Sequence, residues 1–318
     1  MKSEFVKYKA MLPILGVGLG YRPEIAEETL EHPERIDFLE IVSENYLNTG
    51  SLRLKELDRA GDFQIIPHGI SLSIGSTDPI DIDYLNDLRS LFLRIGAPWW
   101  SDHLCFTGIG GMHLHELCPL PYTNEAVRHV AERIWKIQEY MGLPFLLENI
   151  TSYMTLPGAE MDEARFTAEV LERADCGMLL DVNNVFVNAH NHNYDPYAFV
   201  DALPLERVVQ IHIAGHRRSE ALWIDTHGSK ICDGVYDLLA YVLRKTKVHA
   251  ILLERDQYFP KFSAILDQLH RIKLIASKEQ PELVAHARAM DARTGAVDAR
   301  TGPVDAQAGA VDAQARAA

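Results

Sequence analysis

Eight short apolar runs recur along this chain, and each is bounded by polar or turn residues. They do not alternate between apolar and polar positions, a pattern typical of strands buried on both faces. The runs cover residues 14–19, 38–42, 64–67, 98–104, 144–147, 178–182, 208–213 and 250–253. We therefore expect eight central strands of a parallel sheet.

Segments of helical periodicity separate most of these runs. In 124–141 the apolar residues share one face, Thr123 or Asn124 can cap the start, and Gly142 can end it. Segments 81–95, 162–174, 234–245 and 262–276 have similar patterns. Eight strands alternating with helices predict an α/β fold, the (β/α)8 TIM barrel. An open doubly wound sheet is the alternative, but no G-x-G-x-x-G motif opens a helix here.

The chain divides into one barrel domain, predicted over 1–280, and a low-complexity tail over 281–318. From Met290 a seven-residue repeat runs to the end, and three of its four units carry a glycine. It offers one apolar residue larger than alanine in seven, too little apolar surface to offset the entropy of ordering. We expect this tail to be disordered, and no function is evident for it.

Composition limits the partners and the compartment. With 31 basic and 45 acidic residues, the formal net charge is −14, which disfavours general binding to nucleic acid or to anionic membranes. No apolar stretch reaches 18 residues, so we expect no membrane span. A basic and apolar start faintly resembles a signal peptide, but we interpret it as the first strand. Four cysteines without a C-x-x-C pair indicate no disulfide framework and favour the cytoplasm.

Polar side chains follow six consecutive strands, and in a TIM barrel those strand ends meet at one mouth. Any one of them could be a helix cap or a turn residue, but the joint pattern predicts a metal centre. Imidazole and carboxylate ligands without cysteine suit iron(II), manganese or zinc. Six ligands fit two ions, with Glu148 as a reasonable bridge. The predicted ligands are His68, His103, Glu148, Asp181, His212 and Glu254.

A second group of ligands is predicted nearby. In Asp225-Thr226-His227 two side chains of one extended segment can point the same way. With His192 and an asparagine from Asn183-Asn184, they could hold a third ion. Other polar residues near the strand ends are expected to support the ligands or to contact substrate, namely Glu44, Asn45, Asp102, Asn149, Asn183 and His216.

Eight ordered motifs resemble the multinuclear non-haem iron-dependent oxidative enzymes, a family long catalogued as uncharacterised that includes the methanobactin-biosynthesis protein MbnB. The resemblance covers roughly residues 10–275. The tail repeat and Gln210, where we would expect an acidic residue, depart from the pattern. The motifs are FLEIVSENY at 38–46, PHG at 67–69, SDHL at 101–104, LEN at 147–149, DVNNV at 181–185, IHIAGH at 211–216, DTHG at 225–228 and LERD at 253–256.

This resemblance implies a xylose-isomerase-like barrel that holds two or three irons. It implies an oxidoreductase that uses dioxygen to modify cysteine residues of a ribosomally made precursor peptide, with a separate protein that presents the peptide. It assigns the six strand-end residues to the main iron pair and Asn184, His192, Asp225 and His227 to the further iron. Two alternatives remain: a zinc or manganese isomerase or hydrolase on the same barrel, and a non-catalytic subunit that binds metal or peptide.

Overall fold

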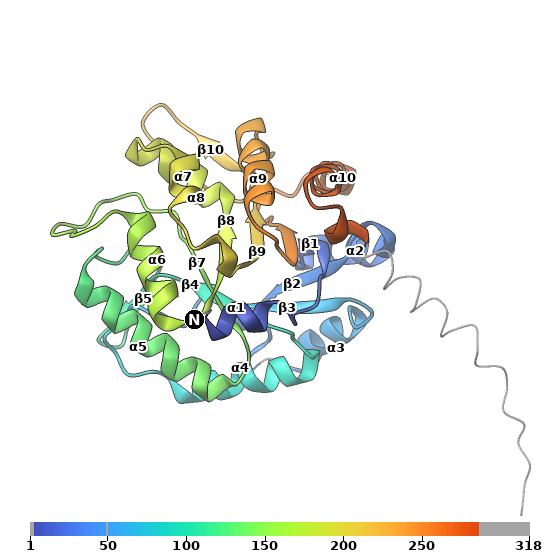
Figure 1. Cartoon of the computed structure of the whole chain (residues 1–318). Helices are drawn as coiled ribbons and strands as arrows, with labels where there is room; N and C mark the ends of the chain where they lie inside the picture. Colours follow the sequence, from blue (N-terminus) through green and yellow to red (C-terminus); the bar gives the residue numbers. More distant parts are fainter. Residues whose placement is uncertain (1–2, 49, 286–318) are drawn as a thin grey trace, which may run out of the picture.

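A closed barrel of eight parallel strands forms the centre of the molecule (Figure 1). This computed structural model describes residues 3–48 and 50–285. Around the barrel the strands follow the order β1-β12-β9-β8-β7-β4-β3-β2, so strands that succeed one another in the chain are neighbours. The strands are β1 (Gly16–Gly20), β2 (Phe38–Val42), β3 (Gln64–His68), β4 (Trp100–His103), β7 (Phe145–Glu148), β8 (Gly177–Asp181), β9 (Val208–Ile213) and β12 (Ala250–Leu253). The predicted TIM barrel is confirmed.

Helices surround the barrel, and the five predicted from periodicity are all present. Thr123 caps α5 by accepting a hydrogen bond from the Ala126 amide, and Gly142 ends it at a positive φ of 64°. The helices are α1 (Glu4–Lys9), α2 (Ala26–Glu31), α3 (Ser51–Arg59), α4 (Ile82–Ile95), α5 (Asn124–Met141), α6 (Glu163–Ala174), α7 (Val182–His192), α8 (Pro196–Asp201), α9 (Asp233–Lys245) and α10 (Phe262–Glu279).

Two hairpins extend from the carboxyl ends of the strands, and the strand pattern did not predict them. After β4 the chain forms β5 (Phe106–Ile109) and β6 (Met112–Cys118), and after β9 it forms β10 (His216–Arg218) and β11 (Trp223–Asp225). Both pairs are antiparallel. They therefore stand at the mouth of the barrel, where they can shape the approach to it.

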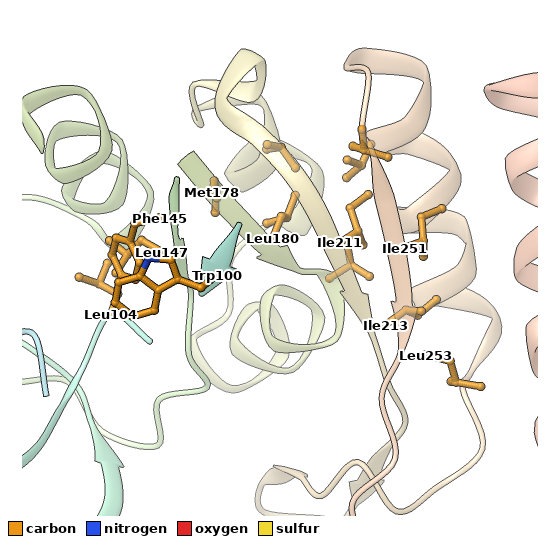
Figure 2. Packing of buried hydrophobic residues seen from close by; sticks show 14 of the residues in the cluster. Trp100, Leu104, Phe145, Leu147, Met178, Leu180, Ile211, Ile213, Ile251 and Leu253 are labelled. Carbon is orange, nitrogen blue, oxygen red and sulfur yellow. The ribbon is translucent and has the colours of Figure 1, made fainter. Parts of the chain in front are cut away.

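Two apolar layers hold the barrel together. Side chains that point outward from the strands pack against the helices, as Figure 2 shows for Trp100, Leu147, Leu180 and Ile251. A separate cluster fills the inside of the barrel away from the mouth, and Phe5 of α1 belongs to it. Its strand members are Phe38, Ile66, Leu146, Leu179, Val209, Ala250 and Leu252. The upper part of the interior is thereby left to polar side chains.

The folded body continues past residue 280, where the sequence pattern placed its boundary. Residues 281–285 are helical, and Leu283 and Val284 are buried. The predicted tail lies mostly in 286–318, outside the described residues. Within the described part of the chain, no helix combines the length and the apolar character that a membrane crossing would need.

Candidate metal centre

Alternation along the strands brings the six predicted strand-end ligands to the inside of the barrel mouth. Successive side chains of a strand point to opposite faces, and residues in register on neighbouring strands point the same way. His103 pairs in register with Glu148, and Asp181 pairs with His212. None of the six is more than 8% exposed, and the set is His68, His103, Glu148, Asp181, His212 and Glu254.

Two histidines face one carboxylate oxygen on one side of the mouth. His68 Nε2 lies 3.3 Å from Glu148 Oε2, and His103 Nε2 lies 3.2 Å from the same atom. The Nδ1 atom of His68 is 2.8 Å from the Ser101 hydroxyl, which fixes the orientation of the ring. Both imidazoles therefore present Nε2 towards Glu148.

The same glutamate also belongs to a second group. His212 Nδ1 lies 3.1 Å from Glu148 Oε1 and 3.1 Å from Glu254 Oε2. With Asp181 these residues form four potential ligands whose donor atoms all lie within 4.8 Å of one another. The first group, His68, His103 and Glu148, meets the same limit. Glu148 is thus shared by two adjacent ligand sets.

Several buried polar atoms of this cluster lack a hydrogen-bond partner within the described structure. Those that face the centre are Glu148 Oε2, Asp181 Oδ2, His212 Nδ1 and His227 Nε2. A buried polar atom without a partner costs about 1–3 kcal/mol. Cations coordinated between these nitrogen and oxygen atoms would remove that cost. The donor set therefore fits iron(II), manganese or zinc.

A carboxylate inside β2 orients His212. Glu40 Oε1 lies 3.0 Å from His212 Nε2, and Glu40 Oε2 accepts a hydrogen bond from Gln210. Trp99 in turn donates to Gln210 Oε1 over 2.8 Å. Gln210, which the sequence pattern marked as a departure, therefore has a defined place beside Glu40. Sequence reasoning missed Glu40 because it lies within an apolar run, although a charge in a fully buried strand was an available signal.

Burial and neighbouring carboxylates shift the pKa values of His103 and His212 in opposite directions. Burial lowers the pKa of His212, but Glu40, Glu148 and Glu254 outweigh it and raise that pKa well above the usual range. At His103 burial is likewise outweighed, chiefly by Glu148, and the pKa rises to about 9. Burial and the two other imidazoles hold the pKa of His68 well below its usual range. The cluster therefore binds protons that a metal would displace.

An outer group lies at the end of the β10–β11 hairpin. His227 Nε2 lies 2.8 Å from Asp225 Oδ1 and 3.9 Å from Asp181 Oδ2. The other ring nitrogen, Nδ1, is 3.2 Å from Glu254 Oε2 and 3.0 Å from Asp256 Oδ2. The backbone of His227 has a positive φ of 45°, an uncommon conformation that is frequent at functional sites. A further cation has two candidate positions here, one on each side of the imidazole.

Sequence reasoning did not assign a role to Asp256 or to Arg22. Arg22 donates to Asp256 Oδ1 from Nε at 3.0 Å and from Nη2 at 2.8 Å. This fork fixes the carboxylate that faces His227. Arg22 Nη2 also lies 3.5 Å from Glu254 Oε1, so one guanidinium offsets part of the negative charge of the centre.

The structure does not bring Asn184 or His192 to the outer group. Asn184 accepts from the Thr151 hydroxyl and donates to the Asn149 carbonyl, while His192 Nε2 lies 2.7 Å from the Ser152 carbonyl. The neighbouring Asn183 contacts Asp225 instead, donating to its Oδ1 over 2.8 Å. In this structure Asn183, and not Asn184, thus lies against the outer group.

Helix α7 is the physical reason for this placement. It begins directly after Asp181, whose side chain caps it by accepting from the Asn184 amide. A rise of 1.5 Å per residue puts His192 about 12 Å beyond Asn184 along the axis, too far to share an ion. Asn183, in the first turn, stays beside the mouth.

The remaining predicted residues mostly hold the loops that carry ligands. Glu44 accepts from the Ile70 and Ser71 amides, and Asp102 accepts from Leu72 and His103. Asn149 exchanges two hydrogen bonds with the Asp181 backbone, and His216 Nδ1 lies 2.8 Å from Asn183 Oδ1. Asn45 is exposed in the turn after β2.

Comparison with known proteins bears directly on this arrangement. Residues 16–277 match the family model described as "RiPP precursor modification enzyme MbnB/TglH/ChrH". The chain belongs to this family of precursor-peptide modification enzymes. A UPF0276 protein of Anaeromyxobacter sp. (strain Fw109-5) is 44% identical over 81% of this chain and 92% of its own length. A UPF0276 protein of Acinetobacter baylyi is 42% identical over 83% and 92%.

Several solved structures share the barrel fold of this protein at low sequence identity. The apo form of the 3-keto-D-glucoside 4-epimerase YcjR from E. coli superposes with a TM-score of 0.53 at 13% identity, covering 82% of this chain and 99% of that chain. A D-allulose 3-epimerase from Methylomonas sp. gives 0.54 at 14% identity, with 85% and 98% covered. These similarities concern the barrel alone.

An open cavity of about 690 Å³ lies at the barrel mouth, above the candidate metal ligands of this protein. Arg22, His68, His103, His227 and Glu254 form its floor and sides. Strand β6 contributes to its rim, together with the segment around Gln257. Its rim residues from β6 are His113, His115, Glu116 and Leu117. The buried ligand cluster is therefore accessible to a molecule that enters from the mouth.

Proposed function

We propose that this protein is an iron-dependent oxidase that uses dioxygen to modify cysteine residues of a ribosomally synthesised precursor peptide. The observation that carries the proposal is the sharing of Glu148 between two ligand sets beneath an open cavity. Membership of a family of precursor-peptide modification enzymes supports a peptide as the substrate. Paired ions bridged by a carboxylate are a recurrent arrangement for metal-assisted catalysis.

Each ligand set would hold one ion. His68 and His103 would bind one iron, Asp181, His212 and Glu254 would bind its neighbour, and Glu148 would bridge the pair. Asp225 and His227 would hold any third ion. Iron bound here would supply one-electron redox chemistry with dioxygen, which protein side chains lack.

The protein's own groups would orient the ligands and exclude water. Glu40 keeps a proton on Nε2 of His212, so that Nδ1 faces the centre. Asp256, fixed by Arg22, does the same for Nδ1 of His227, which leaves Nε2 facing Asp225. The apolar cluster below the ligands closes the barrel from the other end. Only the mouth then admits substrate.

The rim of the cavity suits a peptide. Met112 and Leu114 lie on β6, which also carries the rim residues His113 and His115, and Tyr258 follows the lining residue Gln257; all three are exposed apolar side chains. Exposed apolar groups around a polar cavity are typical of interaction sites. We include in the proposal a separate protein that presents the peptide, and assays with and without it test that part.

The test begins with full-length protein purified without air. Its metals are measured, and it is then incubated with dioxygen, a cysteine-bearing peptide encoded beside its gene, and the neighbouring candidate presenting protein. Mass spectrometry should show a mass change on the cysteine. Glu148→Ala and His212→Ala should abolish it, whereas Glu172→Ala and His270→Ala, which alter exposed helix positions, should not.

Two outcomes would contradict the proposal. Stoichiometric zinc without iron would favour an isomerase or hydrolase on the same barrel. Unchanged cysteine modification in Glu148→Ala and His212→Ala would show that the reaction does not need this centre.

A further inference from the structure

A second cavity, of about 370 Å³, lies outside the barrel mouth. It is formed by the loop that follows β7, the start of α6, and the segment from the end of α7 through α8. Apolar side chains make up most of its wall, among them Leu120, Met161 and Phe199. A concave site with apolar walls and a few polar groups is the usual form of a ligand pocket.

Two polar groups inside this cavity have unused bonding capacity. Glu163 accepts weakly from Asn188 Nδ2, at 3.2 and 3.3 Å, and within the described structure it has no salt-bridge partner. The Tyr194 hydroxyl is buried near Glu163 and makes no hydrogen bond of good geometry among the described residues. His192, in contrast, already bonds the Ser152 carbonyl. A carboxyl group and a phenol hydroxyl are thus available to a ligand.

The charged residues that line the cavity are all acidic. Its lining includes Asp162, Glu163 and Asp195, while no lysine or arginine is found among its described lining residues. Asp162 and Asp195 are helix caps whose side chains accept hydrogen bonds from backbone amides, and both lie in the wall of the cavity. The lining therefore attracts a cation and disfavours an anion.

Aromatic rings add to this preference. Tyr122, Tyr194 and Phe199 all line the cavity, and the faces of such rings attract cations. Apolar walls match an alkyl chain, whereas the carboxylate and the rings match a positive group at its end. This combination describes the side chain of lysine or arginine.

We propose that this cavity binds a lysine or arginine side chain of the precursor peptide, with the methylene groups against the apolar wall and the cation at Glu163. The inference rests on the proposed function, because it takes the ligand to be part of the peptide substrate. It adds a recognition subsite distinct from the metal-binding mouth.

The loop after β7 links the two sites. Ser152 and Met154 of this loop line the cavity, while the hydroxyl of Tyr153 between them accepts from the Asp225 amide over 3.0 Å. Glu148, the shared ligand, lies at the end of β7, immediately before the loop. A peptide anchored in the cavity is thereby held one loop away from the metal centre.

Calorimetric titration of the full chain with small amides tests the proposal. The probes are the Nα-acetyl methylamides of lysine, arginine and norleucine, the last of which keeps an alkyl stem without the charge. The lysine or the arginine amide should bind at least about tenfold more tightly than the norleucine amide, a difference of about 1.4 kcal/mol. Glu163→Gln should remove this difference and leave norleucine binding unchanged, while the matched exposed variant Glu172→Gln should retain it.

Three results would overturn the inference: no binding of any amide, equal binding of the charged and uncharged amides, or an undiminished preference in Glu163→Gln that folds as judged by circular dichroism. The probes contain no cysteine and need no metal. Failure of cysteine modification with amide binding intact would therefore count against the proposed function alone.

Discussion

Glu40 and His212 meet inside the barrel although two strands, β1 and β12, separate their own strands. The carboxylate oxygen lies 3.0 Å from Nε2 of the imidazole, and both side chains are buried. In β1 the register partner of Glu40 is Gly20, and a Cβ atom at Gly20 would lie 3.2 Å from the guanidinium of Arg22. The pair turns the other imidazole nitrogen, Nδ1, towards Glu148 and Glu254.

Replacing Glu40 should weaken metal binding without removing a ligand. In Glu40→Gln the charge that holds the His212 proton is lost, and such outer partners of a metal-bound histidine are worth about 10–100-fold in affinity. Competition with a chelator of known affinity measures the change. An affinity equal to that of wild type would show that Glu40 does not tune this histidine.

Replacing an inner ligand and replacing an outer ligand should lower the number of bound metal ions by different amounts. Glu148→Ala should remove the ions of both inner sets, because it belongs to each of them. Asp225→Ala should lower the stoichiometry by at most the outer ion. Elemental analysis of anaerobically prepared variants distinguishes these cases, and complete loss of metal in Asp225→Ala would contradict the assignment.

Sequence reasoning recovered the barrel because its strands are buried on both faces and its helices carry their own capping residues. That six strand-end residues would gather at one mouth was predictable, since parallel strands deliver their carboxyl ends there; their role as ligands stays a prediction. Glu40 was not, because it lies inside an apolar run. His192 lies away from the outer group because the segment after Asp181, for which no helix was predicted, is helix α7. The distances between Asp225, His227 and Asp256 depend on the β10–β11 hairpin. The sequence pattern did not predict this hairpin, so these distances could not be predicted either.

Metal should stabilise the folded protein measurably. A ligand that binds only the folded state contributes about 2.7 kcal/mol at a concentration 100 times its Kd. For a chain of this size we expect a rise in Tm of about 5 °C on anaerobic addition of iron(II). Differential scanning fluorimetry checks this, with Glu148→Ala as the variant that should not respond. An equal response in that variant would place the stabilising ion elsewhere.

Gly18 should not tolerate a side chain. A Cβ atom there would lie 2.6 Å from the ring of Phe38 and from its carbonyl oxygen, inside the fully buried lower cluster. Gly18→Ala should therefore lower the free energy of unfolding by about 1–3 kcal/mol. Gly50→Ala is the control, since a Cβ atom at that position would meet no described atom within 4 Å. Chemical denaturation compares the two, and equal stabilities would contradict this packing.

Glu163 should make stability depend on pH. Burial raises the pKa of this carboxyl from 4.5 to about 7, so between these values the folded state binds more protons than the unfolded state. Its contribution to stability is then fully present below about pH 4.5 and is lost as the pH rises through 7. Relative to wild type, Glu163→Gln should be similar at pH 5 and more stable at pH 8, by up to about 3 kcal/mol. Denaturant titrations of the protein without a bound cation check this at both pH values, and a pH-independent difference would count against a raised pKa of Glu163 in that state.

The central claim is that side chains far apart in the sequence hold paired iron ions across Glu148. Anomalous diffraction at the iron edge, from crystals of anaerobically prepared full-length protein, tests it most directly. We predict two peaks that flank Glu148, one beside His68 and His103 and the other beside His212 and Glu254. Iron-loaded crystals with no peak at the mouth, or with a single peak that Glu148 does not contact, would contradict the claim.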